Sequence, residues 1–150
     1  MRSDRLTISN EMAELRRMSE WLVSKCLACG IQKEMLSRLE VCANEAVTNI
    51  IRNAYDDSKG HGITLELDKT ATGARLVIRD DGKPFNVLET PEHRQPASLA
   101  DARIGGLGIP LIRRLMSQCA YRRENGINVL CLEAQDTPEN NNEPVERGSP

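Results

Sequence analysis

Aromatic residues are scarce in this chain of 150 residues. Trp21, Tyr55, Phe85 and Tyr121 are the whole set, 3% of the sequence. Proteins that bind single-stranded nucleic acids stack bases on aromatic rings, and this composition offers little such surface. The charges add no opposite signal, because 20 Lys and Arg against 22 Asp and Glu leave a formal net charge of -2. We therefore expect no direct nucleic-acid partner.

Long apolar runs are absent as well. The N-terminal residues, M-R-S-D-R-L-T-I, lack the apolar core of a signal peptide. No later run approaches the roughly 20 apolar residues that span a membrane. We expect a cytoplasmic protein without a membrane partner. A length of 150 residues suits one domain that buries a core without disulfides or metal.

The sequence also has few residues of the kind that hold transition metals. Its two histidines, His61 and His93, form no recognisable ligand cluster with the five cysteines. Cys26 and Cys29 make a C-x-x-C pair, but it lies in a helical pattern without a second pair. We expect reduced thiols in the core, and neither a zinc nor a redox site.

Helical periodicity is strongest after the joint at residues 30–32 and continues to about residue 55. Apolar residues recur there at helical spacing, so they predict one buried stripe: Leu36, Leu39, Ala43, Ala46, Val47, Ile50 and Ala54. Glu45 and Arg52 fall on the opposite side and Asn49 on the flank. Glu45 and Asn49 are four residues apart and are neighbours on the helix surface. Alone, this spacing is more typical of a solvated helix face.

The remaining elements follow from shorter patterns. We expect a strand over residues 5–9 and a helix over 10–29, with Asn10 as N-cap and Gly30 as the stop. A hairpin of strands 63–67 and 76–79 turns near Gly73, a lid-like loop spans 83–104, and a helix spans 107–118. Strands 121–123 and 127–132 close a hairpin at Asn125-Gly126.

This order predicts an α+β fold, a two-layer sandwich of a mostly antiparallel sheet with helices on one face. Residues 1–134 form the expected domain. Residues 135–150 contain almost nothing to bury, so we expect a disordered C-terminal tail.

A glycine motif, I-G-G-L-G-I-P, occupies residues 104–110. Gly105, Gly106 and Gly108, with Leu107 between the last two, precede a predicted helix whose free amides can point at a phosphate. Glycines before a helix can also serve only a turn. The motif fits neither the P-loop nor the dinucleotide-binding pattern.

A second motif, R-D-D-G-K-P-F at residues 79–85, places Asp80 at the end of a predicted strand. Its carboxylate can accept a hydrogen bond from the exocyclic amine of adenine, whereas the carbonyl oxygen of guanine would be repelled. Gly82 allows the backbone to approach a flat ring. An ordinary turn is the alternative interpretation.

The helix adds groups suited to phosphate chemistry. Asn49 offers a neutral oxygen for Mg²⁺, which keeps most of its waters and bridges to phosphates. Glu45, one turn away, can orient or deprotonate a hydroxyl or water near the terminal phosphate. Arg52 either stabilises charge there or is solvated.

Together these residues resemble the GHKL ATPase superfamily of gyrase, histidine kinases and MutL, most closely the bacterial anti-sigma-factor serine kinases. E-A-V-T-N at residues 45–49 resembles their N box. D-D-G-K-P-F at 80–85 and G-G-L-G-I at 105–109 resemble their two glycine boxes. L-I-R-R-L-M and Y-R-R-E-N-G-I-N-V-L, further along, are also similar. The resemblance covers residues 5–134.

The resemblance implies the Bergerat fold, with ATP between the second helix and a lid. It implies Glu45 as catalytic base, Asn49 as Mg²⁺ ligand and Asp80 as adenine contact. Arg52, Asn53, Gly82 and the segment Gly105, Gly106, Leu107 and Gly108 would complete the nucleotide site. The implied substrate is a serine or threonine of a STAS-type anti-anti-sigma protein, with a sigma factor as competing partner and a homodimer as assembly.

Two residues depart from the resemblance. Asn53 stands where many members have His, and Pro84 stands where glycine is common elsewhere in the superfamily.

Other function classes stay open. A module that binds ATP and sequesters a sigma factor without phosphorylation would not need Glu45. A sensor histidine kinase would need an acceptor-histidine helix, whereas His61 lies in a turn and His93 in the expected lid. A gyrase-like or MutL-like ATPase would resemble E-x-x-D-N, but Thr48 precedes Asn49.

Overall fold

The computed structural model describes residues 4–57, 59–89 and 111–136. These residues form, in order, β1 (Asp4–Ser9), the 3-10 turn η1 (Met12–Glu14), α1 (Leu15–Ala28), α2 (Lys33–Asn53), β2 (Gly62–Lys69), β3 (Gly73–Asp80), the 3-10 turn η2 (Val87–Glu89), α4 (Leu111–Leu115), β4 (Gln118–Glu124) and β5 (Ile127–Gln135).

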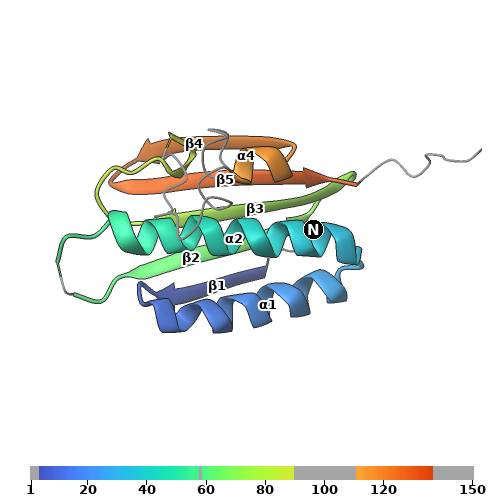
Figure 1. The fold of residues 1–150 in the computed structure, drawn as a ribbon, viewed down its shortest axis with the longest axis horizontal. Helices are drawn as coiled ribbons and strands as arrows, with labels where there is room; N and C mark the ends of the chain where they lie inside the picture. The colour runs from blue at the N-terminus through green and yellow to red at the C-terminus, as the bar shows by residue number, and fades with distance from the viewer. Residues whose placement is uncertain (1–3, 58, 90–110, 137–150) are drawn as a thin grey trace, which may run out of the picture.

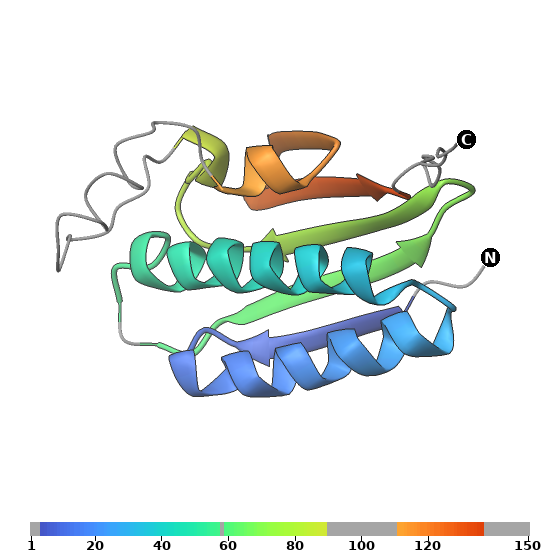
Figure 2. The ribbon, with the colours of Figure 1, turned by 45° about the vertical axis from the view of Figure 1, so that its right-hand side comes forward.

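The strands form one five-stranded sheet in the order β1-β2-β3-β5-β4, and every neighbouring pair is antiparallel. Helices α1 and α2 lie side by side across one face of this sheet (Figures 1 and 2). The predicted α+β two-layer sandwich is therefore confirmed. No helix in the described part of the chain is long and apolar enough to cross a bilayer.

The core lies between the helices and the sheet. Alternate residues of the two central hairpin strands point into it, so Leu65 and Leu76 are fully buried. From the helix side, α2 and its C-cap residue bury the whole stripe that the period predicted: Leu36, Leu39, Ala43, Ala46, Val47, Ile50 and, at the C-cap, Ala54. One face of α2 is thus fixed against the sheet, and its flanks are left for polar residues.

Glycine ends the first helix as predicted. Gly30 adopts a φ of 81°, which residues with a side chain rarely adopt. Its N–H donates to the carbonyl of Leu27 at 3.2 Å, and the N–H of Ile31 donates to that of Cys26 at 2.9 Å. These two bonds satisfy carbonyls that the helix end would otherwise leave unpaired.

The predicted N-cap is wrong. Glu11 and Glu14, rather than Asn10, precede η1 and α1, and neither makes a side-chain capping bond. Asn10 Oδ1 instead accepts from the backbone N–H of His61 at 3.0 Å. Glu14 Oε1 accepts from the N–H of Ser9 at 3.0 Å. The side chain of Asn10 is engaged by a distant loop, so the helix begins later.

The closing hairpin is confirmed, with longer strands than predicted. Asn125 and Gly126 have φ of 52° and 79°, as a tight two-residue hairpin turn requires. Strand β4 already begins at Gln118, so the helix predicted over residues 107–118 ends earlier, at Leu115. Pairing with β5 captures this segment, because Gln118 lies opposite Glu133. Strand β5 includes Gln135, and residues 137–150 of the predicted tail lie outside the described residues.

We expect Leu39→Ala to lower the free energy of unfolding by about 2–5 kcal/mol, because it leaves a cavity under α2. Leu39 is fully buried, whereas Leu27 on α1 is 54% exposed. Leu27→Ala is therefore the matched control, with an expected loss of about 0.5 kcal/mol. Urea denaturation measures both, and equal losses would contradict the buried stripe.

Candidate functional site

One flank of α2 carries three polar side chains at successive turns. The amide nitrogen of Asn49 donates to the backbone oxygen of Glu45 at 2.8 Å and to Glu45 Oε2 at 3.1 Å. The amide nitrogen of Asn53 donates to the backbone oxygen of Asn49 at 2.9 Å. The nitrogen of Asn49 is thus committed to the helix. No described residue donates to its Oδ1, which is the atom that suits a cation.

This flank of α2 faces helix α4 and strand β5. Arg38, seven residues before Glu45 and on the same side of the helix, donates to the carbonyls of Leu115 at 3.2 Å and Gln135 at 3.1 Å. Turn η2 and helix α4 both contact α2. The described elements on either side of residues 90–110, η2 and α4, therefore both lie against α2.

Asp80 ends β3 and is only 3% exposed. Its Oδ1 accepts hydrogen bonds from the N–H of Gly82 and the Nδ2 of Asn128, both at 2.9 Å. Burial raises the pKa of Asp80, and these two hydrogen bonds oppose the rise. No described residue donates to Oδ2. The carboxylate is therefore held by one oxygen, and the other is available to accept from a ligand.

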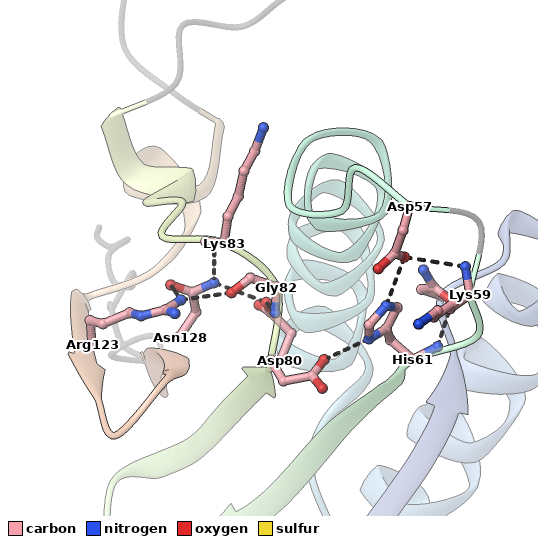
Figure 3. A network of polar contacts seen from close by, with 10 residues as sticks. Asp57, Lys59, His61, Asp80, Gly82, Lys83, Arg123 and Asn128 are labelled. Carbon is pink, nitrogen blue, oxygen red and sulfur yellow. Dashed lines mark hydrogen bonds and ion pairs between the residues drawn. The ribbon is translucent and has the colours of Figure 1, made fainter.

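Asn128 is the residue that sequence analysis missed. It is 3% exposed, and its Nδ2 bridges Asp80 and the carbonyl of Lys83, the latter at 2.8 Å. Its Oδ1 accepts from the hydroxyl of Tyr121, from Arg123 Nη1 at 3.0 Å and from the N–H of Phe85 at 3.3 Å. Figure 3 shows Asn128 between Asp80, Lys83 and Arg123.

A signal for Asn128 was present in the sequence. It alternates with Leu130 and Leu132 along β5, so it takes a core position. Strand register places it opposite Asp80. A polar residue in a core position needs a buried partner, and a buried carboxylate is one. Only the pairing of β3 with β5 shows which residue that partner is.

Gly82 brings the loop after β3 against the end of α2. A Cβ at this position would lie 2.4 Å from the carbonyl oxygen of Ala54 and 2.7 Å from its Cβ. The N–H of Lys83 donates to the same carbonyl at 2.8 Å. The sequence predicted that this glycine lets the backbone come close to a flat ligand ring. Among the described residues its close neighbour is Ala54, so Gly82 ties Asp80 to the helix that carries Asn49.

The structure describes only some of the other predicted residues. Arg52 is exposed and makes no ion pair with a described residue, as suits either interpretation of it. Gly105, Gly106, Leu107 and Gly108 lie outside the described residues. Pro84 is exposed in the loop after β3.

Glu45 also borders open surface. A hollow of about 400 Å³ on the outer side of α2 is lined by Glu40, Val41, Asn44, Glu45 and Thr48. The amide nitrogen of Asn44 donates to Ser19 Oγ on α1 at 3.0 Å. Glu45 therefore lies between the flank that carries Asn49 and a surface that another molecule can reach.

The arrangement joins a buried carboxylate acceptor, an amide oxygen and a second carboxylate through one helix and one strand end. Residues 8–134 match the family of histidine kinase-like ATPase domains. The chain belongs to this family. An ATPase domain implies ATP as the nucleotide, and the antiparallel sheet with helices fits the predicted GHKL-type fold.

Two bacterial protein kinases are similar to this chain in sequence. The serine/threonine-protein kinase BtrW of Bordetella bronchiseptica is 31% identical over 119 residues, which cover 79% of this chain and 84% of that protein. The serine-protein kinase RsbW of Staphylococcus epidermidis is 28% identical over 149 residues, covering 95% and 92%.

Among solved structures, the RsbU and RsbW domains of a Mycobacterium tuberculosis protein align with a TM-score of 0.63 and 16% identity. The alignment covers 92% of this chain and 34% of that one, so the chain spans about a third of the solved protein. At this identity the likeness concerns the fold.

We expect Asn128→Asp to destabilise the protein by about 1–3 kcal/mol, because a second carboxylate would replace the donor to Asp80. The pKa of Asp80 or of the introduced carboxyl group would rise. The loss of stability would therefore grow as pH rises and shrink in acid. Asn125→Asp, at the exposed turn of the same hairpin, is the control and should be near neutral. Urea denaturation at several pH values tests this, and a pH-independent loss would contradict it.

Proposed function

We propose that this protein is an ATP-dependent serine/threonine-protein kinase and anti-sigma factor. Its substrate would be a STAS-type anti-anti-sigma protein, which it phosphorylates in a partner-switching pathway with a sigma factor as the other partner. The kinase domain would be residues 1–134, with β5 continuing to Gln135, and the protein would act as a cytoplasmic homodimer. Both relatives named above are serine or serine/threonine kinases, which supports this class.

The observation that carries the nucleotide assignment is the carboxylate of Asp80. It is buried, fixed through Oδ1 and has no described donor to Oδ2. An ionised carboxylate only accepts hydrogen bonds. Adenine presents an amine where guanine presents a carbonyl oxygen, so this site favours ATP over GTP.

The flank of α2 supplies the groups for phosphoryl transfer. Asn49 presents an oxygen ligand for Mg²⁺, which, when bound, neutralises charge on the phosphate oxygens. Glu45 accepts a hydrogen bond from Asn49, and this contact orients its carboxylate. Because Glu45 also borders the open hollow, its carboxylate can accept the proton of a hydroxyl that a protein substrate brings. Arg52, Asn53 and the glycines at 105, 106 and 108, with Leu107, would hold the phosphates.

Asp80 and Glu45 distinguish a kinase from a module that only sequesters its partner. A protein that binds ATP and holds a sigma factor without phosphorylation needs Asp80 but gains nothing from a carboxylate at Glu45. The two functions therefore predict different results for variants at these two positions.

We expect Asp80→Asn to weaken ATP binding by about tenfold to a hundredfold, because an amide that turns its nitrogen toward adenine repels the amine. Selection of ATP over GTP should fall as well. Asp136→Asn, an exposed position, is the control. Isothermal titration calorimetry with both nucleotides measures these affinities, and unchanged selectivity would remove Asp80 from the base site.

We expect Glu45→Ala and Glu45→Gln to bind ATP within about threefold of the original protein and to slow phosphoryl transfer by about 10²–10⁴-fold. The glutamine variant keeps an acceptor for Asn49 but cannot act as a base. The assay incubates each protein with Mg²⁺, γ-labelled ATP and the STAS-domain proteins of the same genome. A labelled serine or threonine that depends on Glu45 supports the kinase. ATP binding without label transfer would favour the sequestering module.

We expect Asn49→Ala to weaken binding of Mg²⁺-ATP more than binding of metal-free ATP, because it removes the proposed oxygen ligand. Asn44→Ala, on the other side of α2, is the control and should leave the ratio of the two affinities unchanged. Calorimetry with and without EDTA measures the ratio. Equal losses with and without metal would remove Asn49 from the metal site.

A further inference from the structure

A histidine lies between two carboxylates beside the proposed nucleotide site. His61 Nε2 lies 2.9 Å from Asp57 Oδ1, and His61 Nδ1 lies 3.2 Å from Asp81 Oδ1. Its ring stacks on that of Tyr55 with centroids 4.6 Å apart. The histidine side chain is 20% exposed and each carboxylate 51%. Figure 3 shows His61 beside Asp57, next to the end of β3.

This contact joins two segments that meet only in space. Asp57 and His61 belong to the connection from α2 to β2, and Asp81 follows Asp80 at the end of β3. His61 is itself fixed, because its backbone N–H donates to Asn10 Oδ1 at 3.0 Å. His61 therefore links the connection from α2 to β2 with residues 80–83, which we call the Asp80 loop.

The described contacts that hold residues 80–83 differ in how they respond to pH. Asn128, Arg123 and the carbonyl of Ala54 hold the loop through groups that do not gain or lose a proton between pH 5 and 8. Lys83 Nζ also pairs with Asp56 Oδ1 at 3.0 Å. His61 is the one partner of this loop, within the described chain, whose usual pKa lies in that range. Its protonation decides whether the contact to Asp81 is an ion pair.

The hydrogen bond to Asp57 and, after it, that to Asp81 raise the pKa of His61 above its usual value. The same bond to His61 lowers the pKa of Asp57. A histidine with a raised pKa contributes stability that is complete below its unfolded pKa and is lost as pH rises through the raised value. The contribution of Asp57 is present above its unfolded pKa and is lost in acid. The paired contacts of His61 are thus complete from mildly acidic pH up to the unfolded pKa of histidine, and they are lost as pH rises through the raised pKa of His61.

Surrounding charges favour the protonated ring. Asp57 and Asp81 contact it directly, on opposite nitrogens. The other charged groups of the neighbouring segments are Glu11, Asp56, Lys59 and Lys83. Lys83 is paired with Asp56, so the net charge around the ring is negative.

We infer that His61 is a positioning residue for the nucleotide site, which in its protonated form holds the Asp80 loop in the conformation that binds adenine. The inference rests on the proposed function, since it needs adenine to bind at Asp80. Affinity for an adenine nucleotide should fall as pH rises through the titration of His61. By linkage, bound nucleotide should favour the protonated histidine.

The test measures binding of Mg²⁺-ADP by calorimetry from about pH 5.5 to 9, a range that brackets histidine titration. Ionisation of ADP itself cancels in the ratio of variant to original affinity at each pH. We expect His61→Gln to bind about twofold to fivefold more weakly at the acidic end, the range that exposed ion pairs give, and equally at the alkaline end. Asp81→Asn should behave in the same way. Glu20→Gln, which removes an exposed ion pair on α1, is the control with a constant ratio.

A second readout follows the imidazole by NMR in a His93→Gln background, which leaves one histidine. We expect the pKa of His61 to fall in Asp81→Asn and to rise when ADP binds. ADP binding with the same pH dependence in all variants would overturn the positioning role and leave the proposed function intact. No ADP binding at any pH would instead refute the proposed function and the inference with it. A merely structural histidine would lower stability without a pH-dependent affinity ratio.

Discussion

The hydrogen bond between the buried side chains of Asp80 and Asn128 is the constraint on which the site depends. A carboxylate that is 3% exposed has lost most of its water, and only firm donors make that position tolerable. Asn128 supplies one donor and simultaneously fixes the carbonyl of Lys83 at 2.8 Å. One amide therefore sets both the orientation of the carboxylate and the path of the loop that follows it. The central pairing of β3 with β5 brings the two residues together.

Helix α2 extends this constraint to the other half of the site. Its buried stripe fixes the helix against the sheet, so the flank that carries Glu45, Asn49 and Asn53 has a defined direction. The contact of Gly82 with Ala54 then locks the loop of Asp80 to the end of the same helix. The groups proposed for the base and for the phosphates are placed by one rigid helix and one strand end, which suits a site that must hold its geometry.

Periodicity was sufficient to predict α2 and the succession of strands along the chain, because burial of one face imposes a period that the sequence displays. Local signals were less reliable where a distant residue competes. Asn10 has the side chain of an N-cap, but the N–H of His61 uses it. Asn128 and His61 could not be assigned in advance, since their roles come from strand register and from a contact between loops. The glycines at residues 105–108 lie outside the described residues, so their assignment stays a prediction.

Two acidic residues near the proposed nucleotide site, Asp80 and Asp57, lie in different environments, and this difference affects how nucleotide binding should depend on pH. Asp80 is buried and its pKa is raised, and both of its oxygens act purely as acceptors only when the carboxyl group is ionised. Asp57 is half exposed, and the hydrogen bond from His61 lowers its pKa. Proton loss from Asp80 and proton retention by His61 therefore both favour the proposed binding conformation. Binding should therefore weaken in acid, as Asp80 becomes protonated, and at alkaline pH, as His61 loses its proton.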